Sequence, residues 1–307
     1  MKNEKMNNYR SGRSYVFWTM VLILCSISGY MLSKVIFEPE KIKKEKDKIY
    51  NEVSKQTSSA YHEVEKGVNK IQKKERHITK IGHDKLTEYE KDIQRHKEQL
   101  KHTPNNAKLH YEIGLLLQKM SRYDEALKMH EKASQFDKSK SEYYVAAGIS
   151  LQHLNRQEDA ILKYKKASTL IADNYTIYKY WGSALYDLKN YQDAVLKYKK
   201  AISLNQKDAD VYNGYGMALE KINNYQEAEK NYKQAIILNS SNADYYNNLG
   251  VVLYNLSNYK DAITSYEKAI KIDSDRGDFY FNLGLALEKA GRRGEAENAY
   301  QKAKILD

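Results

Sequence analysis

The sequence predicts an all-α solenoid, a protein built from a row of stacked helix pairs. From Ala107 onward the chain repeats every 34 residues, without an insertion or a deletion. Within each repeat, apolar and small residues recur three, four and seven positions apart, which is the spacing of one face of a helix. Helix breakers are scarce, with only 2 prolines and 14 glycines among 307 residues. A helix pair this short cannot bury a core of its own, so successive pairs must stack.

The net charge of +11 does not indicate a nucleic-acid-binding protein, because the repeats contribute little of it. Residues 1–37 hold 5 basic and 1 acidic residues, residues 38–106 hold 17 and 13, and residues 107–307 hold 29 and 26. A phosphate backbone requires a basic face, and the nearly neutral repeats do not show one. We therefore expect no nucleic-acid partner.

The motifs of catalysis and metal binding are missing from the sequence. Cys25 is the single cysteine, which excludes an intrachain disulfide and a cysteine-rich metal site. No histidine pair has zinc-site spacing, and there is no glycine-rich phosphate loop, nucleophile elbow or pair of catalytic carboxylates. We expect a protein that is not an enzyme, without a metal, a cofactor or a small-molecule substrate.

A basic tail, residues 1–14, precedes an apolar segment, residues 15–37, whose first 19 residues carry no charge. A helix of this length can cross a hydrocarbon core of about 30 Å. A cleaved signal peptide would need small residues before the cleavage site, but no alanine precedes Ala60. We therefore predict a retained signal-anchor, a single transmembrane helix that makes this a single-pass membrane protein.

The orientation of the predicted anchor is not decided by its flanking charges. Basic residues precede it (Lys2, Lys5, Arg10, Arg13) and follow it (Lys34, Lys41, Lys43, Lys44, Lys46, Lys48). Translocating the charged tail is costly, which favours an N-terminus inside and repeats outside the cytoplasm. The lysine- and asparagine-rich composition suggests an AT-rich genome, and we expect a bacterial inner membrane.

A charged linker, residues 38–85, follows the anchor. Its sparse apolar residues, from Ile42 to Ile78, follow the 3.6-residue period of a straight helix. This pattern fits a solvated, partly helical stalk, and it also fits a weak coiled coil that makes a homodimer. Cys25, Gly29 and Ser33 lie four residues apart and allow two anchors to pack closely, although a short apolar segment can show this spacing by chance.

Residues 86–106 are expected to form a capping helix over the first repeat. Tyr89, Ile93 and Leu100 lie in register with the apolar residues of the second helices farther along the chain. At the other end, Glu297 and Lys304 replace apolar residues, so that the last helix presents a polar face and the array can end.

Residues 107–307 carry a repeated pattern of small residues. The six glycines are Gly114, Gly148, Gly182, Gly216, Gly250 and Gly284, and the first of two alanine series is Ala126, Ala160, Ala194, Ala228, Ala262 and Ala296. With the 34-residue period, this pattern resembles the tetratricopeptide repeat (TPR). The resemblance implies a right-handed α-solenoid of six TPR hairpins: 107–140, 141–174, 175–208, 209–242, 243–276 and 277–307. It also implies a concave groove lined by the first helices.

Ten of the 28 tyrosines recur at two positions of the repeat and are expected to pack between helices rather than to stack on bases. One series lies in the first helices: Tyr144, Tyr178, Tyr212, Tyr246 and Tyr280. A second lies in the second helices: Tyr164, Tyr198, Tyr232, Tyr266 and Tyr300.

The groove-facing positions do not repeat, so they are candidates for binding a protein or an extended peptide. The candidate groove residues are Lys179, Tyr186, Asn213, Met217, Asn247, Asn248, Val251, Tyr254, Phe281, Asn282 and Leu285. Their apolar members form a stripe of the kind that usually marks a partner surface, and the amides can bind a peptide backbone. The alternative is a groove filled by neighbouring helices or by the linker.

Two details of the groove bear on its partner. Asn248 and Asn282, each followed by Leu-Gly, resemble the asparagine ladder of the family's glycosyltransferase-linked arrays. Acidic residues such as Asp210 and Asp244 stand where members that bind chaperone tails carry basic ones, so a chaperone tail is not expected.

Two functions remain open. The first is a membrane-anchored adaptor or scaffold whose groove recruits a protein partner. The second is a self-associating structural protein, in which the linker and anchor oligomerise and the repeats serve as a spacer or assembly surface.

Overall fold

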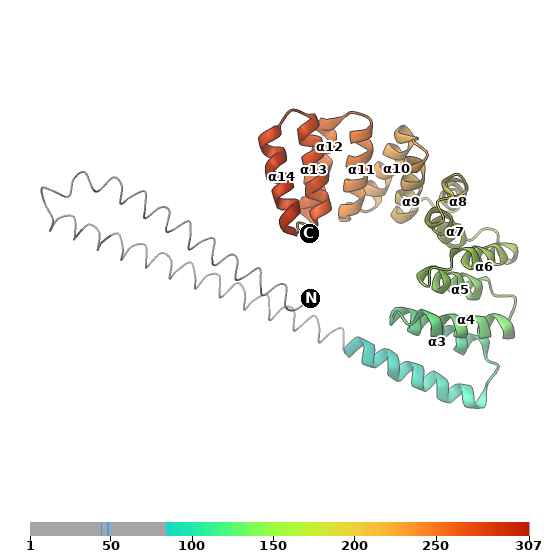
Figure 1. Ribbon diagram of the computed structural model, residues 1–307. Coiled ribbons are helices and arrows are strands. Elements are labelled where there is room, and N and C mark those ends of the chain that lie inside the picture. Colours follow the sequence, from blue (N-terminus) through green and yellow to red (C-terminus); the bar gives the residue numbers. More distant parts are fainter. Residues whose placement is uncertain (1–43, 45–47, 49–83, 307) are drawn as a thin grey trace, which may run out of the picture. The chain divides into compact units, whose positions relative to one another are not determined.

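The computed structural model describes residues 44, 48 and 84–306 of the chain (Figure 1). The predicted anchor lies outside these residues, as does all but a few residues of the predicted linker. Among the residues that are described, no helix is both long and apolar enough to cross a bilayer.

Residues 84–306 form helices joined by short turns and contain no β-strand. A helix spans residues 84–102. Twelve further helices follow: α3 Ala107–Lys119, α4 Tyr123–Phe136, α5 Ser141–His153, α6 Gln157–Leu170, α7 Tyr175–Asp187, α8 Tyr191–Leu204, α9 Ala209–Lys221, α10 Tyr225–Leu238, α11 Ala243–Asn255, α12 Tyr259–Ile272, α13 Gly277–Lys289 and α14 Arg293–Leu306. The odd-numbered helices lie on the inner side of the arc that these helices describe (Figure 1). The predicted all-α solenoid is confirmed.

The turn within each pair places one residue in the left-handed backbone region. These residues are Ser121, Asn155, Lys189, Asn223, Ser257 and Gly291. Only the last is a glycine, although the left-handed region costs other residues roughly 1 kcal/mol. Backbone hydrogen bonds compensate: the amide of Asn223 donates to the carbonyl of Glu220 and that of Asn224 to Leu219, both at 2.9 Å.

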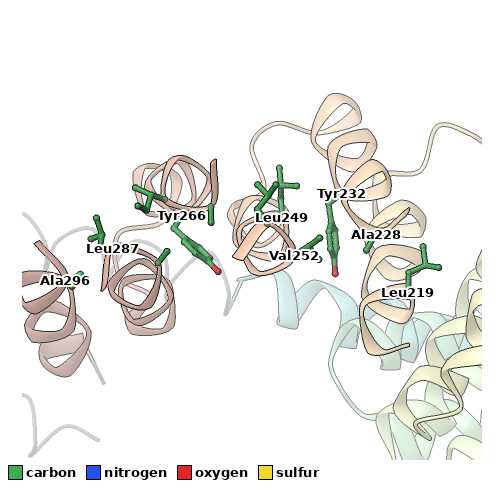
Figure 2. Close-up of a cluster of buried hydrophobic side chains, with 13 residues drawn as sticks. Leu219, Ala228, Tyr232, Leu249, Val252, Tyr266, Leu287 and Ala296 are labelled. Carbon is green, nitrogen blue, oxygen red and sulfur yellow. The ribbon is translucent and has the colours of Figure 1, made fainter. Parts of the chain in front are cut away.

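The two helices of each pair meet where an aromatic ring lies on the repeated glycine. A Cβ added to Gly250 would lie 2.5 Å from Cε1 of Tyr266, closer than atoms can approach. The same contact joins Gly148 to Tyr164 and Gly216 to Tyr232. Tyr232 and Tyr266 are buried in one cluster with Leu249 and Val252 (Figure 2). Packing of the second-helix tyrosines is therefore observed.

The first-helix tyrosines are less buried than expected. They are half-buried, and the buried position lies one residue earlier, at Tyr143, Ile177, Val211, Tyr245 and Phe279. Phe279, for example, packs against Ala243 and Ala269 of the preceding repeat. The residue at this earlier position points back between the two helices of the pair before it, and that contact joins successive repeats.

The helix at residues 84–102 packs on the first repeat. Ile93 is buried against Ile113 and Leu117, and the guanidinium of Arg122 binds the carboxylate of Glu90 at 2.6 Å.

His130 breaks the series of second-helix tyrosines in the first repeat. Its ring lies on Gly114, and its centroid is 5.6 Å from that of Tyr111. The side chain is fully buried, and neither ring nitrogen has a hydrogen-bond partner among the described residues. Burial lowers the pKa of His130 to about 4.

Replacing Gly250 by alanine is expected to destabilise the array. Alanine favours a helix by about 1 kcal/mol over glycine, but overpacking against the buried Tyr266 ring costs roughly 1–3 kcal/mol. Gly294→Ala is the matched control, because a Cβ there meets nothing within 4 Å. Urea unfolding followed by circular dichroism should show a lower midpoint for G250A and an equal or higher one for G294A. Equal midpoints for G250A and the wild type would contradict the ring-on-glycine contact.

Replacing His130 by phenylalanine is expected to make the first repeat less sensitive to acid. Between pH 6.5 and about pH 4, His130 is protonated in the unfolded chain but neutral in the folded chain. The free energy of unfolding therefore decreases as the pH falls through this window. The loss is on the order of 3 kcal/mol. Amide hydrogen exchange of α3 and α4 at pH 7 and pH 4.5 should show a smaller increase in opening for the variant. An identical increase in the two proteins would rule out His130 as its source.

Candidate functional site

The eleven candidate groove residues all lie on the inner, odd-numbered helices. Helix α7 carries Lys179 and Tyr186, and α9 carries Asn213 and Met217. Helices α11 and α13 carry the others: Asn247, Asn248, Val251, Tyr254, Phe281, Asn282 and Leu285.

Four of these residues line a cavity of about 270 Å³ between α7 and α9. The complete lining is Lys179, Tyr180, Ser183, Tyr186, Asp187, Tyr198, Asp210, Asn213, Gly214 and Met217. The cavity combines tyrosine rings and a methionine with charged groups at its edge. We call it the α7–α9 pocket.

Gly214 and Tyr198 belong to this pocket but were not among the predicted site residues. A Cβ on Gly214 would lie 2.6 Å from Cζ of Tyr198, so the glycine lets that ring reach the groove from a second helix. The signal in the sequence was a second glycine two residues before the repeated Gly216. A glycine at this position indicated that another group packs close to the helix backbone, but only the structure identifies that group as the ring of Tyr198.

Lys179 forms an ionic network between the third and fourth repeats. Its ammonium lies 2.9 Å from Asp208 and 3.2 Å from Asp210. Burial opposes its charge, but the hydrogen bond and charge of Asp208, with a contribution from Asp210, raise the pKa of Lys179. The hydroxyl of Tyr245 donates to Asp210 at 2.5 Å, and this bond is the main cause of a lowered pKa at Asp210.

The groove asparagines bond to each other across successive first helices. The amide of Asn248 donates to Oδ1 of Asn213 at 3.0 Å, and that of Asn282 to Oδ1 of Asn247 at 2.9 Å. These two hydrogen bonds use side-chain amide and oxygen groups that we expected to be available to a peptide backbone. The side-chain oxygens (Oδ1) of Asn248 and Asn282 have no hydrogen-bond partner among the described residues and can still accept hydrogen bonds.

The apolar stripe is less exposed than the sequence suggested. Met217 and Val251 are half-buried because they pack against the core cluster between neighbouring helices. Phe281 is 51% exposed, and its ring centroid lies 5.8 Å from that of Tyr300. It is the most open apolar side chain among the candidate groove residues.

Two further ionisable groups of the inner helices have pKa values that burial raises. Burial raises the pKa of Glu220, which accepts a hydrogen bond from Tyr232 at 3.1 Å. Burial also raises the pKa of Tyr186 to about 12, so its hydroxyl stays protonated at neutral pH. Within the part of the chain that the structure describes, no cluster of His, Cys, Asp and Glu could hold a metal ion.

The fold and the repeated contacts agree with family and structural comparisons. The sequence pattern described as "TPR repeat" matches residues 182–223, 221–257 and 253–291, and the one described as "Tetratricopeptide repeat" matches residues 277–306. The chain belongs to the tetratricopeptide repeat proteins, whose members bind protein or peptide partners. Nothing in these comparisons suggests catalysis.

Among solved structures, the chain is similar to MamA, with 31% identity, a TM-score of 0.50, and coverage of 52% of this chain and 93% of that one. It has the fold of YrrB, described as a TPR protein with an unusual peptide-binding site (22% identity, TM-score 0.52, coverage 58% and 92%). It also has the fold of PilF from Pseudomonas aeruginosa (18% identity, TM-score 0.59, coverage 66% and 91%). No curated protein matches in sequence.

Proposed function

We propose that the protein is a membrane-anchored adaptor that binds an extended segment of a partner protein along its inner face and recruits that partner to the membrane. The α7–α9 pocket is the observation that carries the binding part of this proposal. The pocket lies on the inner face of the array, where TPR proteins receive peptides. Some of its side chains take no part in the contacts that hold the repeats together.

The groove offers an extended chain two kinds of contact beyond this pocket. The free oxygens of Asn248 and Asn282 are placed to accept hydrogen bonds from a peptide backbone, and Phe281 offers an exposed ring. Backbone contacts with pockets for alternate side chains are a general way to bind an extended peptide.

The membrane part of the proposal is supported by the uncharged run in residues 15–37. We place the protein in a bacterial inner membrane with the N-terminus inside and the repeats outside the cytoplasm. The cost of translocating the charged tail favours this orientation.

Phe281→Ala is expected to reduce partner binding without loss of the fold. The side chain is half exposed, so its removal costs little stability, but it takes an apolar contact from the groove. Leu196→Ala is the matched control, because Leu196 is 60% exposed on α8, a second helix. Proteins cross-linked to the tagged full chain in cells and identified by mass spectrometry should include a partner that F281A loses and L196A keeps.

The two variants must give the circular dichroism spectrum and urea midpoint of the wild type. Equal recovery of every partner by F281A and L196A would contradict binding along the inner face. Loss of self-association in F281A, with no other partner lost, would favour the structural alternative.

Deletion of residues 1–37 is expected to release the protein from the membrane. The full chain should stay in the membrane pellet after washing at alkaline pH, and the shortened chain should move to the soluble fraction, because no apolar span remains among residues 84–306. Protease added to spheroplasts should digest the repeats of the full chain. A pellet that retains the shortened chain would contradict the anchor, and protected repeats would reverse the orientation.

A further inference from the structure

We propose that the α7–α9 pocket binds an arginine side chain of the partner segment. This inference rests on the proposed peptide-binding function and names the chemistry of one of its contacts. It follows from the position of the pocket, its charge and its aromatic lining.

One contact between first helices is missing beside the pocket. In the fifth and sixth repeats, Asn248 and Asn282 bridge to the helix before them. The equivalent residue of the fourth repeat is Gly214, which has no side chain to bridge to α7. The ring of Tyr198 from α8 lies against Gly214, and both residues line the pocket of about 270 Å³.

The charge of the pocket is negative. Lys179 is the only basic residue in the lining, and it is neutralised by its contacts with Asp208 and Asp210. Asp187 forms no ion pair among the described residues, and it accepts a weak hydrogen bond from Gln152 at 3.4 Å. The lining therefore holds two aspartates, Asp187 and Asp210, and one lysine, and this arrangement attracts a cation and repels a carboxylate.

The lining favours arginine over a simple ammonium group. The half-buried Tyr180 and Tyr186 contribute aromatic rings, and Met217 contributes a polarisable thioether, while Tyr198 is buried against Gly182 and Gly214. A guanidinium is planar, stacks on aromatic faces and pairs with a carboxylate through two parallel N–H groups. An arginine can thus stack on a tyrosine ring while it pairs with Asp187.

The test is a selection of nonapeptides from a random library displayed on phage, using the purified full chain as the target. The peptides that are enriched should share one arginine. The tightest peptide is then synthesised with arginine or with citrulline, its neutral near-isostere, and both are titrated calorimetrically. Citrulline should weaken binding at least tenfold.

Asp187→Asn assigns the arginine to the pocket. It should weaken the arginine peptide roughly threefold to tenfold and leave the citrulline peptide unchanged, because only the charged pair is lost. Glu158→Gln is the matched control, an exposed acid on α6 outside the pocket, and should change neither affinity.

Three results would overturn the inference: no enrichment, enriched peptides without a shared arginine, or an arginine peptide that binds wild type and D187N equally. If F281A still loses a cross-linked partner in any of these cases, the proposed function stands and only the arginine assignment fails.

Discussion

The contact between an aromatic ring and a helical glycine is the constraint on which the rest of this structure depends. In each pair it sets how closely the two helices approach, because the ring occupies the space that a side chain on the glycine would fill. Equal contacts at equal spacing produce equal pairs, and equal pairs stack with a constant rotation. The first helices consequently fall on one side of the array, which creates the inner face.

Contacts between neighbouring first helices then decide how much of that face is available. The side chains of the groove asparagines hydrogen-bond to each other, Asn248 to Asn213 and Asn282 to Asn247, so part of their hydrogen-bonding capacity is already used. Lys179 likewise forms ion pairs with Asp208 and Asp210, which lie at the start of α9. Side chains of the inner face stay accessible where such a contact is incomplete, as beside Gly214, and Phe281 on α13 is also exposed.

The candidate site was predictable as a face but not as a pocket. Helical spacing grouped Lys179 with Tyr186, and Asn213 with Met217, on one face of each helix, and the resemblance to the TPR implied that this face lines the groove. Tyr198 was assigned to packing alone, because its repeat position is a packing position. Its access to the groove depends on a glycine in another repeat, and that contact is not local in sequence. The apolar stripe was overestimated for the same reason, since helical spacing cannot show how closely a neighbouring helix covers Val251.

By itself, the sequence determined the helix pairs, their number and their order, because a 34-residue period and recurrent small residues are local properties that each repeat carries in full. Only the tertiary structure decided which residue of the first helix is buried between repeats, which groove groups bind each other, and where a pocket remains. These features depend on distances between helices about 30 residues apart in the chain, and those distances are set by stacking rather than by any one repeat.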